Sequence, residues 1–145
     1  VGISLTGIED IMVRFGKCCD PIPGDEVVGF VSRGRGITVH KADCPHAQEA
    51  EPDRLVELEW NIKERHAYPV HMRVICKDKK GALAEISSVI AASDVNISQA
   101  HVDIEDLNAV LNFRLDVSDL NQFNKVVSAI KRIKNVQSVE RVKHI

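Results

Sequence analysis

Apolar and polar side chains alternate almost without interruption between residues 109 and 117, and this run constrains the fold more than any other feature. A period of two residues places every second side chain on the same face of an extended strand. The apolar face consists of Ala109, Leu111, Phe113, Leu115 and Val117, and the opposite face carries Asn112, Arg114 and Asp116. Residues 97–104 also have an extended pattern, with Ala100, Val102 and Ile104 on one face. With the polar turn 105–108 between them, the two runs predict a β-hairpin.

A half-buried strand and a helix are predicted before the hairpin. Residues 68–76 alternate in the same way, and a polar turn at residues 78–81 leads into a helical pattern over residues 82–92. The apolar positions of the strand are Val70, Met72, Val74 and Cys76, and those of the helix are Leu83, Ile86 and Ile90, with Ala82 and Val89 beside them. Each element therefore buries one side only.

A second helix and a last strand are predicted after the hairpin. Asp119 and Gln122 have the spacing of a capping box, and the helix ends before Asn135. Its apolar positions are Leu120, Phe123, Val126, Val127, Ile130 and Ile133. Residues 136–142 form a weaker strand, because Val136 and Val139 do not share a face of period two. The order strand, helix, strand, strand, helix, strand predicts a ferredoxin-like βαββαβ domain, with both helices on one face of an antiparallel sheet.

The first half is rich in glycine and proline and differs in character. Short strands are predicted over residues 27–32, 37–40 and 55–60, and a short helix over residues 42–50. We interpret this part as a small mixed α/β module of about 60 residues, a size at which a hydrophobic core alone is marginal. A metal ion or another cross-link would stabilise such a module.

The chain is therefore predicted to be α+β with two domains. The first spans residues 1–62, the polar segment 63–67 is the linker, and the second domain spans residues 68–145. A hydrophobic content of 44%, a charged content of 28% and the lack of a long apolar run predict no membrane insertion. The chain begins with Val1 and has no signal-peptide pattern, so we expect a cytoplasmic piece of a longer protein.

Three thiols and an imidazole in the first half are the strongest chemical signal: Cys18, Cys19, His40 and Cys44. This is the ligand set of a closed structural zinc site, and His40 and Cys44 could converge at the entry to a helix. Adjacent cysteines can both reach one ion only in a turn, which the following Asp20-Pro21 permits. The alternatives are one packed and one exposed cysteine, or a redox switch formed by the two thiols.

A catalytic cysteine with His40 as its base lacks an orienting third group, so no catalytic residue is predicted. Cys76 lies on an apolar strand face and is predicted to belong to the core. The other histidines have no ligand-like spacing and are interpreted as solvated or packed: His46, His66, His71, His101 and His144.

Candidate contacts to RNA are the basic residues of a glycine-rich loop, Arg33, Arg35 and Lys41. A second basic group lies near the chain's end: Lys125, Lys131, Arg132, Lys134, Arg141 and Lys143. A net charge of −2 gives no global attraction to nucleic acid, so such binding would be local. A solvated helix face is the alternative. The turn at residues 78–81 could also receive an anion at the start of a helix.

Longer motifs resemble one protein family. They are Phe15-Gly16-Lys17-Cys18-Cys19-Asp20-Pro21-Ile22-Pro23-Gly24-Asp25, Gly29-Phe30, Arg33-Gly34-Arg35-Gly36-Ile37-Thr38-Val39-His40 and Ala42-Asp43-Cys44-Pro45. Together they resemble the zinc-finger or ribosome-intersubunit domain of long RelA/SpoT-family (p)ppGpp synthetase/hydrolases. Asp78-Lys79-Lys80-Gly81-Ala82-Leu83-Ala84, with Asn96-Ile97, resembles the signature of the ACT domain that follows it in that family. Lys79 departs from the arginine common there, which removes bidentate anion geometry.

The resemblance implies a regulatory region of the stringent response without its own nucleotide turnover. It implies contacts to rRNA and tRNA on the ribosome, pairing of ACT sheets in a homodimer, and an amino-acid ligand. The implied zinc ligands are Cys18, Cys19, His40 and Cys44. The implied amino-acid pocket is formed by Asp78, Gly81, Ala82, Leu83, Asn96 and Ile97. Two hypotheses follow: a sensor of ribosome or tRNA state, or an ACT dimer whose amino-acid ligand, with branched-chain amino acids as candidates, controls the linked enzyme.

Overall fold

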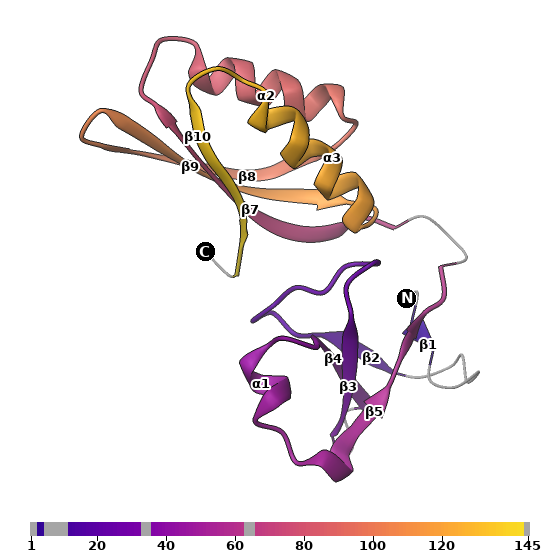
Figure 1. The fold of residues 1–145 in the computed structure, drawn as a ribbon. Helices are drawn as coiled ribbons and strands as arrows, with labels where there is room; N and C mark the ends of the chain where they lie inside the picture. The colour runs from indigo at the N-terminus through magenta and orange to yellow at the C-terminus, as the bar shows by residue number, and fades with distance from the viewer. Residues whose placement is uncertain (1–2, 5–11, 33–35, 63–65, 144–145) are drawn as a thin grey trace. The chain divides into compact units, whose positions relative to one another are not determined.

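A computed structural model of the chain describes residues 3–4, 12–32, 36–62 and 66–143. The chain divides into two compact units (Figure 1). The boundary falls between His66 and Ala67. Residues 63–65 of the predicted linker lie outside the described residues. Among the described residues, no helix is both long and apolar enough to cross a membrane.

The second unit has the predicted ferredoxin-like architecture. Its elements are β7 (Tyr68–Lys77), α2 (Ala82–Ala92), β8 (Asn96–Glu105), β9 (Asn108–Val117), α3 (Leu120–Lys131) and β10 (Val136–Val142). The sheet order is β10-β7-β9-β8, and every neighbouring pair is antiparallel. Both helices lie on one face of this sheet (Figure 1). The predicted fold class and element order are confirmed.

The core of this unit lies between the sheet and the two helices. Alternate residues of β9 from Ala109 to Val117 are buried, as the pattern predicted, and Phe113 is the largest fully buried side chain. It faces Met72 of β7 across the ladder. Ile86 and Ile90 of α2 complete the layer with residues of α3, namely Phe123, Val126 and Ile130.

The capping box of α3 forms with one difference. Asp119 Oδ1 accepts the backbone N–H of Gln122 at 2.7 Å, as predicted. The side chain of Gln122 does not return to the backbone of Asp119 but accepts the N–H of Ser118 at 2.7 Å. The backbone N–H groups in the first turn of a helix have no acceptor within the helix, and Asp119 supplies one for Gln122. The second bond holds the backbone of Ser118, the residue before the cap. The start of α3 is therefore well defined.

A bulge explains why the last strand had a weak pattern. Val136 pairs with Cys76, and Val139 pairs with Val74, with a shift of register between Val136 and Ser138. Because Cys76 and Val74 share a face of β7, the extra residue in β10 places the two valines on that face as well. The strand is therefore regular on both sides of the bulge, although its sequence breaks the period of two.

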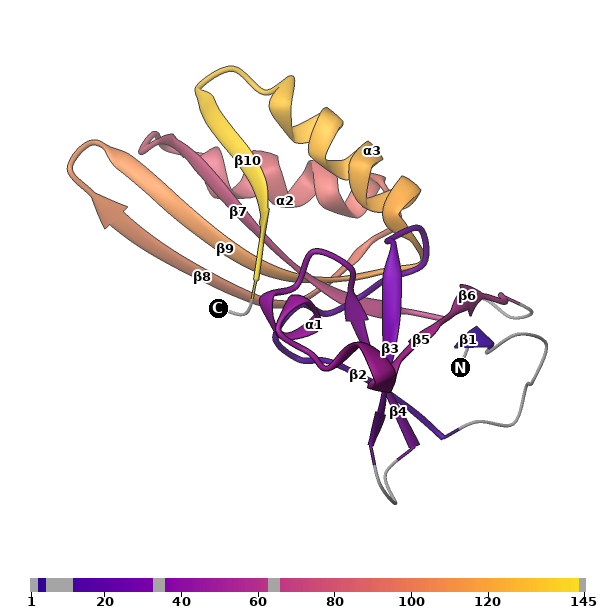
Figure 2. The same cartoon turned by 60° about the horizontal axis from the view of Figure 1, so that its bottom comes forward.

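Some apolar side chains in β8 and in the first turn of α2 are exposed, although the sequence pattern placed them on apolar faces. Leu83 is 45% exposed, so its assignment to the buried stripe of α2 is wrong. In β8, which lies at the edge of the sheet (Figure 2), Ile104 is 55% exposed and Val102 is also exposed. Spacing shows that side chains share a face, but it does not show where the layer covering that face ends.

The first unit is a small mixed sheet, as predicted. Its elements are β1 (Ile3–Ser4), β2 (Val13–Phe15), β3 (Val27–Ser32), β4 (Gly36–Lys41), α1 (Pro45–Gln48), the 3-10 turn η1 (Pro52–Arg54), β5 (Leu55–Glu57) and β6 (Glu59–Trp60). The sheet order is β2-β4-β3-β5, with β2 parallel to β4 and the other pairs antiparallel. A separate pair joins β1 to β6.

Other details of this unit were not predicted, among them β1 and η1. β2 was missed because a strand of three residues is too short to show a period. The segment 55–60 is two strands rather than one, divided at the buried Leu58. The predicted helix 42–50 is shortened to α1, because the chain first makes a turn in which Cys44 N–H donates to Lys41 O at 3.0 Å. Pro45 then begins the helix, a position at which proline loses no hydrogen bond.

Candidate metal centre

A tight turn after β2 brings the adjacent Cys18 and Cys19 to one side of the chain. The backbone N–H groups of Cys19 and Asp20 both donate to Gly16 O, at 3.4 and 2.9 Å. Asp20 has a φ of 43°, which closes the turn before Pro21. The requirement that neighbouring cysteines lie in a turn rather than in a strand is therefore met.

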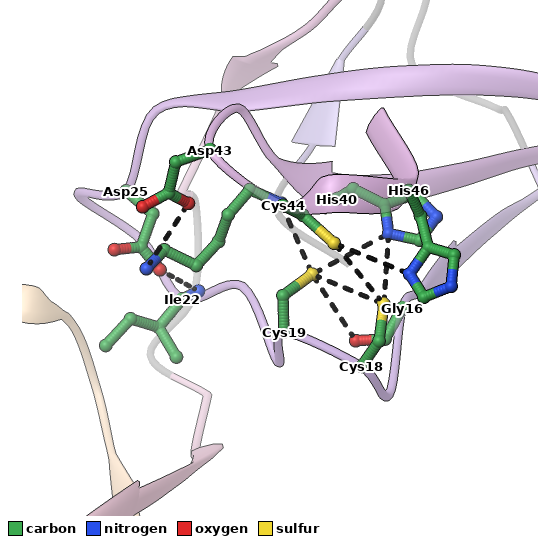
Figure 3. A network of polar contacts seen from close by, with 10 residues as sticks. Gly16, Cys18, Cys19, Ile22, Asp25, His40, Asp43, Cys44 and His46 are labelled. Atoms are coloured by element: carbon green, nitrogen blue, oxygen red, sulfur yellow. Dashed lines mark hydrogen bonds and ion pairs between the residues drawn. The ribbon is translucent and has the colours of Figure 1, made fainter. Parts of the chain in front are cut away.

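His40 and Cys44 reach the same place from a different part of the unit. His40 lies in β4, and Cys44 is the residue that caps the start of α1. The turn from Lys41 to Cys44 reverses the chain between them. Figure 3 shows the three thiols and the imidazole directed toward one another. The predicted convergence of His40 and Cys44 at the entry to a helix is what the structure shows.

The four donor atoms are compactly arranged. All lie within 4.8 Å of one another. Cys18 Sγ is 3.9 Å from Cys19 Sγ and 3.6 Å from Cys44 Sγ. His40 Nδ1 is 3.3 Å from Cys18 Sγ and 3.7 Å from Cys19 Sγ. Tetrahedral zinc with its usual bond lengths would separate two sulfurs by about 3.8 Å, and sulfur from nitrogen by about 3.6 Å. The donor set and its spacing therefore fit a closed tetrahedral site.

Gly16 makes this approach possible and was not singled out from the sequence. A Cβ at Gly16 would lie only 2.7 Å from Nδ1 of His40. Any larger residue would therefore push the imidazole away from the thiols. The backbone adds a further contact, because Lys41 N–H donates to Cys19 Sγ at 3.4 Å.

The three thiols differ in their affinity for protons. Burial raises the pKa of Cys18, and burial together with the neighbouring thiols raises the pKa of Cys19 to about 12. Burial alone would also raise the pKa of Cys44, but hydrogen bonds from the ring and backbone of His46, and from Cys18, lower it to about 6. The raised pKa values of Cys18 and Cys19 favour their protonated forms, which a metal ion must displace, whereas the lowered pKa of Cys44 favours its thiolate.

His46 is the residue near the cluster that sequence spacing did not identify. Its Nδ1 lies 3.8 Å from Cys44 Sγ, and its ring centroid lies 6.1 Å from that of His40. A separation of two residues is not a usual ligand spacing. The available signal was its position in the first turn of a short helix that Cys44 caps.

The candidate RNA contacts are only partly described. Arg33 and Arg35 lie outside the described residues. Lys41 is partly buried at the end of β4, and its Nζ lies 3.7 Å from Asp43 Oδ1. Gly36 begins β4 and Lys41 ends it, so Lys41 lies at the far end of the strand from the glycine-rich segment. The backbone of Lys41 instead supports Cys19 of the cysteine cluster.

The residues of the predicted amino-acid pocket form two separate groups in one chain. Asp78 N–H donates to Leu107 O at 2.8 Å, which places Asp78 at the hairpin end of the sheet. Asn96 lies at the other end, where its side chain donates to Asp116 Oδ2 at 3.0 Å. Residues 108–116 of β9 separate the two ends, a length of about 27 Å. Gly81, Ala82 and Leu83 belong to the first group and Ile97 to the second.

A small cavity lies beside the first group. Its volume is about 100 Å³, and among the predicted residues Ala82 lines it. Four lysines also line it: Lys77, Lys79, Lys80 and Lys134. Glu85 is the acidic residue among those that line it.

Two domain families match the chain in tandem. The RelA/SpoT RIS domain matches residues 3–61, and the ACT domain matches residues 64–141. The solution structure of the ACT domain from GTP pyrophosphokinase of Chlorobium tepidum is 22% identical, with a TM-score of 0.50 over 55% of this chain and 90% of that one. This likeness supports the ACT fold of the second unit.

Curated relatives match nearly the whole chain. A GTP pyrophosphokinase of Myxococcus xanthus is 41% identical over 97% of this chain and 19% of its own length. A GTP pyrophosphokinase of Escherichia coli (strain K12) is 30% identical over 90% of this chain and 18% of its own length. The chain thus spans about a fifth of the length of these relatives. It belongs to the RelA/SpoT family, of which it carries the RIS domain followed by the ACT domain.

Proposed function

We propose that this chain senses the state of the ribosome and its tRNA and relays that state to the catalytic domains of a (p)ppGpp synthetase/hydrolase. The observation that carries the proposal is the tandem of a RIS and an ACT domain, shared with relatives named GTP pyrophosphokinase. In this role the chain has no catalytic residues of its own. Its partners are rRNA and tRNA, in the cytoplasm.

Zinc is the metal that the cluster would hold, and its role is structural. Cys18, Cys19, His40 and Cys44 supply four donors, so no position remains open for a substrate. The ion would tie the turn after β2 to β4 and to the start of α1. Because Lys41 follows His40 directly, this cross-link would also hold the backbone of Lys41, which is one of the candidate RNA contacts.

Binding to ribosomes tests the sensor hypothesis. The wild-type chain is expected to co-sediment with ribosomes, and the Arg33→Ala/Arg35→Ala double variant is expected to bind more weakly. Every phosphate that the variant no longer neutralises should reduce the slope of log affinity against log salt by roughly one. Arg54→Ala/Lys77→Ala, at exposed basic residues outside both candidate groups, is the matched control and should retain the wild-type slope. Absence of the wild-type chain from the ribosomal pellet at low salt would contradict the hypothesis.

A second candidate function is an ACT dimer controlled by an amino acid, and the separation of the predicted pocket residues favours it. One chain cannot bring Asn96 to Asp78, but two chains could. If β8 pairs with β8 of a second copy about a two-fold axis, the strands run antiparallel. The start of each β8 then lies beside the hairpin end of the other sheet. The exposed Val102 and Ile104 support such a contact, since edge strands readily accept another strand.

Calorimetry and native mass spectrometry test this second function. A branched-chain amino acid such as valine or isoleucine is expected to release or absorb heat on binding, and the dimer is expected in the mass spectrum. Val102→Lys/Ile104→Lys should abolish both signals together, because like charges then face each other across the two-fold axis. Asn121→Lys on the exposed face of α3 is the control. Ligand binding by a chain that stays monomeric would contradict the shared pocket.

A further inference from the structure

We infer that His46 donates a hydrogen bond to the thiolate of Cys44 and thereby strengthens metal binding from outside the ligand set. This inference rests on the zinc site proposed above. It adds a positioning residue that lies neither among the four donors nor in any motif of the sequence. Its basis is the geometry around Cys44, the most deeply buried of the three clustered thiols, at 1% exposure.

The contacts distinguish His46 from the ligand His40. His40 Nδ1 approaches two thiols, Cys18 and Cys19, as a donor at the centre of the cluster does. Among the thiols of the described residues, His46 Nδ1 contacts that of Cys44 alone, at 3.8 Å, which is within hydrogen-bonding range for sulfur. The His46 side chain is exposed, and its ring lies beside that of His40 at an interplanar angle of 33° (Figure 3). His46 therefore lies outside the four donors and contacts one of them.

The hydrogen bond from His46 to Cys44 would matter because the site with zinc bound carries a negative charge. Three thiolates and a neutral imidazole around a divalent ion leave a net charge of about −1 in a partly buried place. N–H groups directed at the sulfurs offset that charge. Cys19 receives such a bond from the backbone of Lys41. For Cys44 the corresponding donors come from His46, through both its backbone and its ring.

The consequence is a division of roles along α1. Cys44 caps the helix without using its sulfur to cap the backbone, so the sulfur is available to the metal. Pro45 fixes the direction of the first turn. His46 then extends back toward the sulfur of Cys44. Removal of its ring should leave the four ligands in place but make the Cys44 thiolate more electron-rich and less stable.

The experiment uses the whole chain and measures Co²⁺ and Zn²⁺ binding in competition with a chelator. His46→Ala and His46→Leu are expected to weaken binding about 10-fold to 100-fold, the usual range for outer neighbours of metal ligands. They should also move the thiolate-to-cobalt charge-transfer band to lower energy. His46→Asn, whose side-chain amide can donate near the position of Nδ1, should keep the affinity within about threefold. His101→Ala, at an exposed histidine of the ACT unit, is the matched control.

Three results would overturn the inference, and they can be told apart. If the wild-type chain binds neither ion, the zinc proposal fails and the role of His46 fails with it. If the wild type binds but His46→Ala and His46→Leu match it in affinity and band position, the zinc proposal stands and the inference is wrong. If His46→Asn loses as much affinity as His46→Ala, the ring does not act as a simple hydrogen-bond donor, and the inference is again wrong.

Discussion

Replacing Cys18 by serine is expected to reduce the metal content of the chain from about one ion to almost none and to unfold the first unit selectively. Cys18 Sγ lies within 3.3 to 3.9 Å of the other three donor atoms, so its loss opens the centre of the cluster. Structural zinc in small domains contributes roughly 10–16 kcal/mol of binding free energy. The apolar core of a unit of about 60 residues is marginal, so the loss of a contribution of that size is expected to unfold it.

Native mass spectrometry and thermal melting with and without a chelator measure this effect. The wild-type chain should lose one transition on chelation, whereas the Cys18→Ser chain should lack that transition from the start. Cys76→Ser is the matched control, because Cys76 is also buried but lies in β7 of the ACT unit and not among the four candidate ligands. Retention of a full equivalent of zinc by Cys18→Ser would show that Cys18 is not a ligand.

Replacing Phe113 by alanine is expected to lower the free energy of unfolding of the ACT unit by about 3–5 kcal/mol. The Phe113 side chain is 1% exposed and occupies the middle of β9, between Met72 of β7 and Ala100 of β8. Its removal leaves a cavity in the layer between the sheet and the helices. Because single domains are stable by only about 5–15 kcal/mol, this is a large share of the total.

Chemical denaturation followed by circular dichroism measures the loss. Leu107→Ala is the control: Leu107 is 84% exposed in the hairpin turn, and its truncation should change stability by less than about 0.5 kcal/mol. Metal content should stay unchanged in both variants, because the two units are separate compact bodies. A cost below about 1 kcal/mol for Phe113→Ala would mean that the core is packed differently.

The candidate metal centre could be foreseen in its composition but not in its arrangement. Three thiols and one imidazole are visible in the sequence, and the need for a turn at Cys18 and Cys19 follows from strand geometry. The turn itself is closed by backbone hydrogen bonds to Gly16 O, and such contacts cannot be read from the residue types. The sequence pattern suggested a helix that begins at residue 42, but the helix begins at Pro45. The proximity of His46 to Cys44 depends on this later start.

The sequence by itself determined the secondary structure and order of the ACT unit, because periodicity is a local property that each strand and helix carries alone. Only the tertiary structure decided which residues from distant segments meet. Parallel pairing of β2 with β4 joins the Cys18 turn to His40, and the bulge in β10 restores the face shared by Val136 and Val139. The length of β9 separates Asp78 from Asn96. Such distances depend on strand register and turn geometry, which local spacing does not encode.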